Sequence, residues 1–206
     1  MKKRTLIVSG VGAAALAMIA VTAGVSNAGQ TPAAAPVVKA ADSSAQADSF
    51  LGGKPSVPAA IKVPDGNVLT SVFKAHGVQN YGCNASGAWA LNEPAAVLTG
   101  LSLKPVKPAT AIHFRGPSWQ SDSDGSLVVG TGPVSAPSAN PNSIAQLLIT
   151  AVAPDALHAG QTGVFSGVTF IQRLNTKGGV APAGGCSAGQ TAAVKYTADY
   201  RFFKAA

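Results

Sequence analysis

The sequence predicts an all-β fold: one antiparallel β-sandwich or barrel, closed by a single disulfide and containing little helix. Apolar and polar residues alternate with the period of a strand, and helical periodicity is scarce. Runs of β-branched and aromatic residues are separated by frequent turn signals such as Gly132-Pro133. The chain also has two cysteines, Cys83 and Cys186, which suits one disulfide.

Residues 1–28 are predicted to be a cleavable signal peptide of bacterial type. Basic residues at positions 2–4 precede an apolar run over 6–25, and Ser26 and Ala28 are small residues where a signal peptidase reads them. The run approaches the ~20 residues of a membrane span, but its alanine and glycine content favours cleavage. We therefore expect an exported protein without a membrane anchor after cleavage, secreted or, in a host with an outer membrane, periplasmic.

Two segments are expected after the leader. Residues 29–60 are mostly Ala, Pro, Ser and Gly, which predicts a disordered spacer, because so few apolar side chains do not offset the entropy lost on ordering. A β domain then spans residues 61–206, an ordinary size for one domain.

The charge of the mature chain is mild. Removing the three basic leader residues from the fifteen in the chain leaves twelve, against eight acids, so the net charge is about +4. No window concentrates these basic residues on one short segment. No nucleic-acid partner is therefore expected.

The first predicted strands are 68–75 and 110–114, which carry β-branched and aromatic residues. A short apolar strand follows at 126–129, after a turn at Asp122–Gly125 whose D-x-D-G letters also resemble the start of a calcium loop. No further acid follows Asp124 until position 155, so a turn held by aspartate side chains is favoured.

Three further elements complete the predicted sheet. The apolar run 143–152 is either a buried strand or a short helix, because periodicity alone does not separate the two. Residues 163–174 are long enough for a full strand. In the last strand, one face is apolar and the other polar. The apolar face carries Val194, Tyr196, Ala198, Tyr200 and Phe202.

Export favours a disulfide between Cys83 and Cys186 over other uses of the two thiols. A zinc site needs about four ligands, and no second Cys or His lies at ligand spacing from either cysteine. A thiol protease needs a free thiolate, which an even pair in an oxidising compartment disfavours. We therefore expect neither a metal nor a cofactor.

Two catalytic motifs match by letter but lack their context. Gly185–Gly189 reads G-x-S-x-G, yet it follows a loop-like sequence, and no histidine follows Ser187 to complete a hydrolase triad. Ser71–Lys74 reads S-x-x-K, but the local pattern is that of a strand and the partner motifs are missing. No catalytic residue is assigned, and the sequence leans away from an enzyme.

The candidate ligand-binding residues are His113, Arg115, Trp119 and Arg173. His113 and Arg115 are two apart on a predicted strand and so share a face, and Gly116-Pro117 can turn the chain to bring Trp119 beside them. Arg173 could join from the strand over 163–174, where its guanidinium suits carboxylate or sugar oxygens. The alternative is that the same residues form a buried structural network.

Several motifs resemble a secreted family found in bacteria and fungi, the domain of unknown function 3455. They are the segments 77–83 (GVQNYGC), 113–119 (HFRGPSW) followed by 124–126 (DGS), and 171–179 (IQRLNTKGG) continuing to Cys186. The resemblance covers about Val57 to Phe203 in the same order. It implies one exported domain with two cysteines and supplies no catalytic residues.

Three functions compete. A non-enzymatic extracellular module that binds a small polar or carbohydrate ligand, or a surface polymer, fits best. A structural or stress-related envelope protein is the second possibility. A small secreted hydrolase acting on carbohydrate is the third, because glycosidases need two carboxylates across a cleft and most acids here fall in turns or on an exposed strand face. Ligand identity and oligomeric state are left open.

The leader generates a first testable prediction. Because small residues at Ser26 and Ala28 follow an apolar run, cleavage should leave a chain that starts at Gly29, within a residue or two. Intact-mass measurement of the exported protein checks this. A full-length product retained in the membrane would contradict it.

Overall fold

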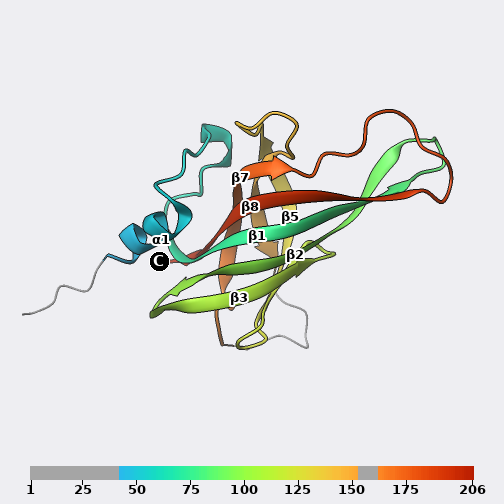
Figure 1. The fold of residues 1–206 in the computed structure, drawn as a ribbon. Coiled ribbons are helices and arrows are strands. Elements are labelled where there is room, and N and C mark those ends of the chain that lie inside the picture. Colours follow the sequence, from blue (N-terminus) through green and yellow to red (C-terminus); the bar gives the residue numbers. More distant parts are fainter. Residues whose placement is uncertain (1–41, 153–161) are drawn as a thin grey trace, which may run out of the picture. The chain divides into compact units, whose positions relative to one another are not determined.

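The computed structural model describes residues 42–152 and 162–206 and shows an eight-stranded antiparallel barrel (Figure 1). Each strand pairs with the next along the chain, and β8 pairs with β1 to close the sheet. The all-β prediction is confirmed, and the structure selects the barrel over the sandwich. The strands are β1 (Asn67–Cys83), β2 (Trp89–Leu103), β3 (Val106–Phe114), β4 (Ser118–Ser121), β5 (Leu127–Ala136), β6 (Gln146–Val152), β7 (Val168–Gly178) and β8 (Thr191–Ala205).

Alternate connections of this meander lie at opposite ends of the barrel. The β1–β2, β3–β4, β5–β6 and β7–β8 connections share one end, which we call the hairpin end. There the predicted disulfide is confirmed: it joins Cys83, the last residue of β1, to Cys186 in the β7–β8 connection, 103 residues later. The bond therefore ties the long β1–β2 hairpin to the neighbouring β7–β8 connection, and Figure 1 shows both extending beyond the other strands.

The opposite end is filled by Phe165, from the segment before β7. Its ring packs against Phe73 of β1 and Phe202 of β8, with ring centroids 5.7 and 4.5 Å away. These three side chains are almost fully buried. Aromatic packing of this kind gives the barrel a dense core at the end away from the hairpins.

Asp124 holds the Phe165 segment in place from the β4–β5 turn. Its carboxylate accepts hydrogen bonds from the backbone N–H groups of Val164 (2.9 Å) and Ser126 (3.1 Å) and from the Ser126 hydroxyl (2.6 Å). The D-x-D-G segment is thus a turn, and its Asp124 carboxylate accepts hydrogen bonds from within the protein. Because residues 163–167 form this cross-connection, β7 begins at Val168 and not at residue 163 as the sequence predicted.

The last strand follows its predicted alternation. Tyr196, Ala198, Tyr200 and Phe202 are buried in the barrel core, while Val194 is half-buried where β8 extends toward the hairpin end. The ambiguous run 143–152 proves to be a strand, with β6 covering its last seven residues. The shorter strands predicted at 68–75 and 110–114 lie within the longer β1 and β3, and the strand predicted at 126–129 begins one residue before β5.

β2 has no counterpart among the strands predicted from the sequence. Its inward positions include Ala96 and Gly100, which carry little of the hydrophobic signal that marks a strand, and its outward Val97 is 61 % exposed. Pro94 also lies within it, opposite Gln79 and close to a bulge at Asn92 of β2. Pairing with β1 along most of its length is what makes this segment a strand.

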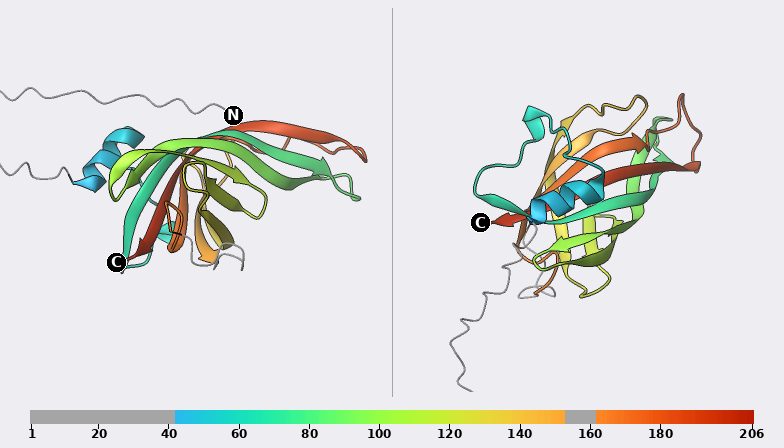
Figure 2. Two further views of the ribbon diagram at one scale, coloured as in Figure 1. Left: turned by 90° about the horizontal axis from the view of Figure 1, so that it is seen from below. Right: turned by 60° about the vertical axis from the view of Figure 1, so that its left-hand side comes forward.

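The predicted disordered spacer is wrong for residues 42–60. Helix α1 (Ser43–Leu51) lies against the outer face of β1 and β2 (Figure 2), where Ala47 and Leu51 pack with Val72 and Leu103. Asp42 caps the helix by accepting a 3.0 Å hydrogen bond from the N–H of Ser44. Two apolar positions one turn apart suffice because the sheet offers an apolar face; composition alone does not show that face.

A short helix, η1 (Ala59–Ile61), follows α1 along the chain. Ile61 is buried, and its carbonyl accepts a 2.7 Å hydrogen bond from the Gln172 side chain on β7. The predicted signal peptide and residues 29–41 lie outside the described residues. Within the described ranges, no helix is long and apolar enough to cross a membrane.

Docking of α1 on the barrel can be tested with one pair of variants. Ala47→Arg places a charged, bulky side chain in the buried contact and should lower the free energy of unfolding by about 2 kcal/mol. Ala45→Arg, on the exposed face of the same helix, should change it by less than about 0.5 kcal/mol. Denaturant unfolding measures both, and equal values for the two variants would mean that α1 does not dock.

Candidate functional site

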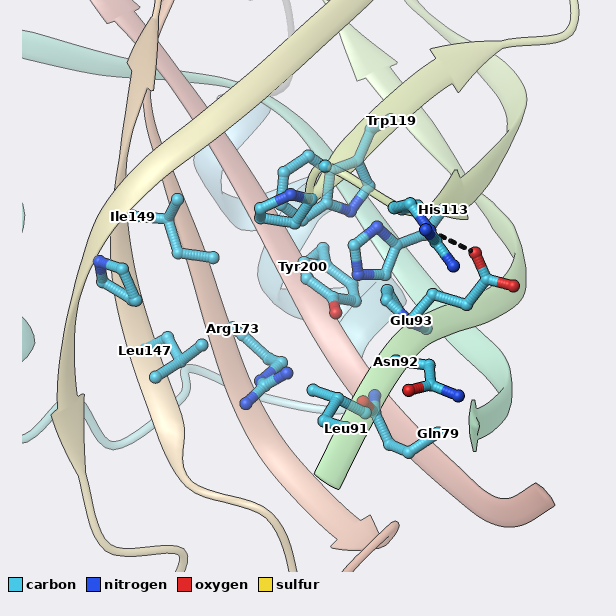
Figure 3. A pocket seen from close by; sticks show the side chains of 15 residues that line it. Gln79, Leu91, Asn92, Glu93, His113, Trp119, Leu147, Ile149, Arg173 and Tyr200 are labelled. Atoms are coloured by element: carbon cyan, nitrogen blue, oxygen red, sulfur yellow. Dashed lines mark hydrogen bonds and ion pairs between the residues drawn. The ribbon is translucent and has the colours of Figure 1, made fainter. Parts of the chain in front are cut away.

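A cavity of about 440 Å³ lies inside the barrel toward the hairpin end (Figure 3). Every one of the eight strands contributes to its wall. All four residues predicted as ligand-binding are part of this wall. The lining residues are Gln79, Leu91, Asn92, Glu93, Pro94, His113, Arg115, Gly116, Pro117, Trp119, Pro133, Leu147, Ile149, Arg173 and Tyr200.

His113 and Trp119 form one side of the cavity. They are register partners on β3 and β4, and their rings stack with centroids 4.3 Å apart and an interplanar angle of 2°. Tyr200 of β8 meets both rings edge-on, at 5.4 and 5.6 Å. The turn between β3 and β4 permits this stack because Gly116 adopts a φ of 142°, which residues with a Cβ rarely reach.

Trp119 and His113 both line the cavity and belong to the packed core. Trp119 is fully buried and His113 is 3 % exposed, so each belongs to the packed interior as well as to the cavity. The sequence offered a ligand site or a buried structural network as alternatives. In the structure the same side chains are packed in the core and line a cavity.

His113 is held as a neutral imidazole. Its Nδ1 lies 2.9 Å from the carbonyl oxygen of Ser118, and because a carbonyl only accepts, Nδ1 carries the proton. Burial lowers the pKa of His113 to about 4; the bond to Ser118 raises that pKa, and the nearby charge of Arg173 lowers it. Nε2 therefore keeps its lone pair, and Figure 3 shows that edge of the ring directed toward Tyr200 and Arg173.

Three polar atoms in the wall are buried without a hydrogen-bond partner among the described residues. They are the indole Nε1 of Trp119, the hydroxyl of Tyr200 and the amide Nε2 of Gln79. Buried polar groups are nearly always paired with protein or water, because an unpaired group costs about 1–3 kcal/mol. All three side chains also line the cavity.

Arg173 provides a cation on the side of the cavity opposite Trp119. It lies on β7 between Leu147 and Tyr200 of the neighbouring strands. Its Nε and Nη2 both donate to the carbonyl of Ala145, at 3.2 and 2.8 Å. No carboxylate of the described chain lies within ion-pair distance of this half-buried guanidinium, and its Nη1 donates to none of the described residues.

Arg115 differs from the other predicted residues. β3 ends at Phe114, so Arg115 lies just beyond the strand, at the rim of the cavity, with a side chain that is 72 % exposed. Its Nε donates to Glu93 of β2 at 3.0 Å. The charge of Arg115 is thus balanced locally, whereas the charge of Arg173 is not.

Several wall residues escaped sequence analysis. Tyr200 was placed on the inward face of the last strand, but nothing local indicated that it meets His113. Gln79 lies in the 77–83 motif, which assigned it no role, and Glu93 and Leu147 lie in no motif. Their proximity depends on strand register across the closed sheet, which no short segment encodes.

The other motifs remain outside the cavity. Ser187 of the G-x-S-x-G segment is exposed in the β7–β8 connection, beside the disulfide-bonded Cys186. Ser71 and Lys74 are three apart on β1 and so point to opposite faces. His158 lies outside the described residues. Among the residues that the structure describes, no group of three or more His, Cys, Asp or Glu side chains could hold a metal ion.

The lowered pKa of His113 makes stability depend on pH. An unfolded histidine titrates near 6.5, so as the pH falls the unfolded state binds a proton before the folded state does. Above about pH 7, His113 has no effect on the free energy of unfolding. As the pH falls from about 6.5 to 4, protonation of His113 in the unfolded state lowers the free energy of unfolding, by about 2 kcal/mol at pH 5. Urea unfolding at pH 7.5 and 5.0 measures the loss.

Two variants separate His113 from other titrating groups. His113→Phe keeps a ring in the stack but does not titrate, so its stability should fall about 2 kcal/mol less than that of the wild type between these pH values. His76→Gln, at an exposed position on β1, should retain the wild-type pH dependence. Unchanged pH dependence in His113→Phe would show that the buried imidazole is not the titrating group.

A family model described as "Protein of unknown function (DUF3455)" matches residues 64–204, which include all the lining residues of the cavity and nearly all of the barrel. No curated protein and no solved structure matches the chain. The family match agrees with the resemblance carried by the motifs around Cys83, His113 and Arg173. The chain therefore belongs to the DUF3455 family of proteins of unknown function.

Proposed function

We propose that this protein binds a small organic molecule inside its barrel. The observation that carries the proposal is a cavity of about 440 Å³ with three buried polar atoms in its wall that lack a partner among the described residues. This volume lies within the range of small-molecule sites, which are mostly apolar with a few convergent polar groups. Leu147 and Ile149 supply apolar surface beside those polar groups.

The polar groups offer complementary chemistry. Trp119 Nε1 and Gln79 Nε2 can donate, the Tyr200 hydroxyl can donate or accept, and Nε2 of the neutral His113 can accept. Because all sit on strands of a closed sheet, their positions are fixed before a ligand arrives. A rigid site of this kind loses little entropy on binding, which favours affinity.

The wall supports binding more than catalysis. Glu93 is the one carboxylate among the lining residues, and it is paired with Arg115. A carbohydrate hydrolase would need a second carboxylate facing it. With a pKa of about 4, His113 is a weak base at neutral pH, and no serine, threonine, cysteine or lysine lines the cavity to act as a nucleophile.

The compartment belongs to the same proposal. The disulfide between Cys83 and Cys186 is compatible with an oxidising environment, and the leader predicted over residues 1–28 would direct the chain there. We therefore propose that the protein binds its ligand after export. The cavity and the disulfide together favour the extracellular binding module. No feature of the described residues specifically favours the structural envelope protein.

A fragment screen with a cavity-filling variant tests the proposed function. Ligand-observed NMR with the purified protein should identify small aromatic or cyclic fragments that bind. Leu147→Trp fills part of the cavity from β6 and should weaken their binding at least tenfold while the protein stays folded. Val97→Trp adds the same bulk on the exposed outer face of β2 and should leave binding unchanged.

Two results would contradict the proposal. A screen without a single hit on the folded protein would favour the structural envelope role. Hits that bind Leu147→Trp as well as the wild type would place the site outside the barrel.

A further inference from the structure

The charge balance of the cavity identifies the class of its ligand. Among the described lining residues there are two cations, Arg115 and Arg173, and one anion, Glu93. Glu93 pairs with Arg115 at the rim, so the cavity keeps one uncompensated positive charge, on Arg173. A half-buried guanidinium without a counterion attracts an anion more strongly than an exposed one, because water screens it less.

We infer that the ligand is an organic monocarboxylate with a compact apolar body, an inference that rests on the binding function proposed above. One uncompensated charge matches a single negative charge. A phosphate monoester would bring a second charge into a cavity that already contains Glu93. The planar guanidinium also matches the geometry of a carboxylate, and Nη1 is the part of Arg173 left free by Ala145.

Neighbouring donors fit the same group. Tyr200 lies on the strand next to Arg173, at the paired position of β8, and its buried hydroxyl lies close to the hydroxyl of Tyr196. Figure 3 shows Tyr200 and Arg173 facing the same space, with Gln79 farther along that side. A carboxylate bound by Arg173 would thus lie beside the Tyr200 hydroxyl, which can donate to it.

The remaining wall suits an apolar body. Leu147 of β6 lies across the cavity from the ring of His113, as Figure 3 shows, and Ile149 packs near Trp119 beside Gly130. A ring or a branched chain placed between these surfaces would be removed from water on both sides. The carboxylate would then lie toward Arg173 and the apolar body toward Trp119.

Benzoate and its neutral isostere benzamide test this inference directly. By titration calorimetry, the wild-type protein should bind benzoate at least tenfold more tightly than benzamide, because only benzoate meets the charge of Arg173. Arg173→Gln should abolish this preference while benzamide affinity changes less than about threefold. Arg173→Lys should retain part of the preference. Lys107→Gln, which removes an exposed positive charge at the other end of β3, should retain all of it.

The outcomes separate the inference from the function on which it rests. Equal binding of benzoate and benzamide by the wild type, or binding of neutral fragments without benzoate, overturns the carboxylate assignment and leaves the binding function intact. An unchanged preference in folded Arg173→Gln also overturns it, because the anion would then be recognised elsewhere. Failure of every fragment to bind removes the proposed function itself. The wild-type comparison holds even where a variant does not fold.

Discussion

Pairing between β1 and β8 is the constraint on which the rest of the structure depends. These strands are far apart in the sequence, yet their register runs from Asn67 opposite Ala205 to Gly82 opposite Thr191. Without this pairing the sheet would be open, with two unpaired edges and no interior. Closure creates the inside surface on which Phe73, Trp119 and Tyr200 are buried, and it creates the cavity.

The interior of the barrel has a packed end and an end that contains the cavity. At the end away from the hairpins, Phe165 enters from a loop and fills the barrel against Phe73 and Phe202. Toward the hairpin end, the wall changes to His113, Arg173 and other polar groups, and the cavity remains. An eight-stranded barrel is just wide enough to be filled by side chains or to hold one small ligand, and this chain does each at a different end.

Stability and binding are coupled through the same side chains. Trp119 and His113 belong to the core, so truncating either would remove packing as well as part of the wall. A loss of binding after such a truncation would not identify a ligand contact. Residues that line the cavity without filling the core, such as Arg173, are therefore the informative positions for substitution.

The sequence by itself determined the fold class, the disulfide pair and four residues that lie around one cavity. Each of these depends on local signals: the alternation in β8, the two cysteines, and the short path from His113 through Gly116-Pro117 to Trp119. Alternation predicts which face of a strand is buried because successive side chains point to opposite sides. That physical rule acts within a single strand and needs no knowledge of its neighbours.

Tertiary structure alone decided the barrel, the β2 strand, the docked α1 helix and the charge balance of the site. β2 is a strand because β1 and β3 pair with it, and α1 is ordered because the outer face of β1 and β2 covers Ala47 and Leu51. Arg173 has no counterion among the described residues, whereas Arg115 pairs with Glu93. These features arise from contacts between segments distant in the chain, and strand register, which sets those contacts, is fixed only when the whole sheet closes.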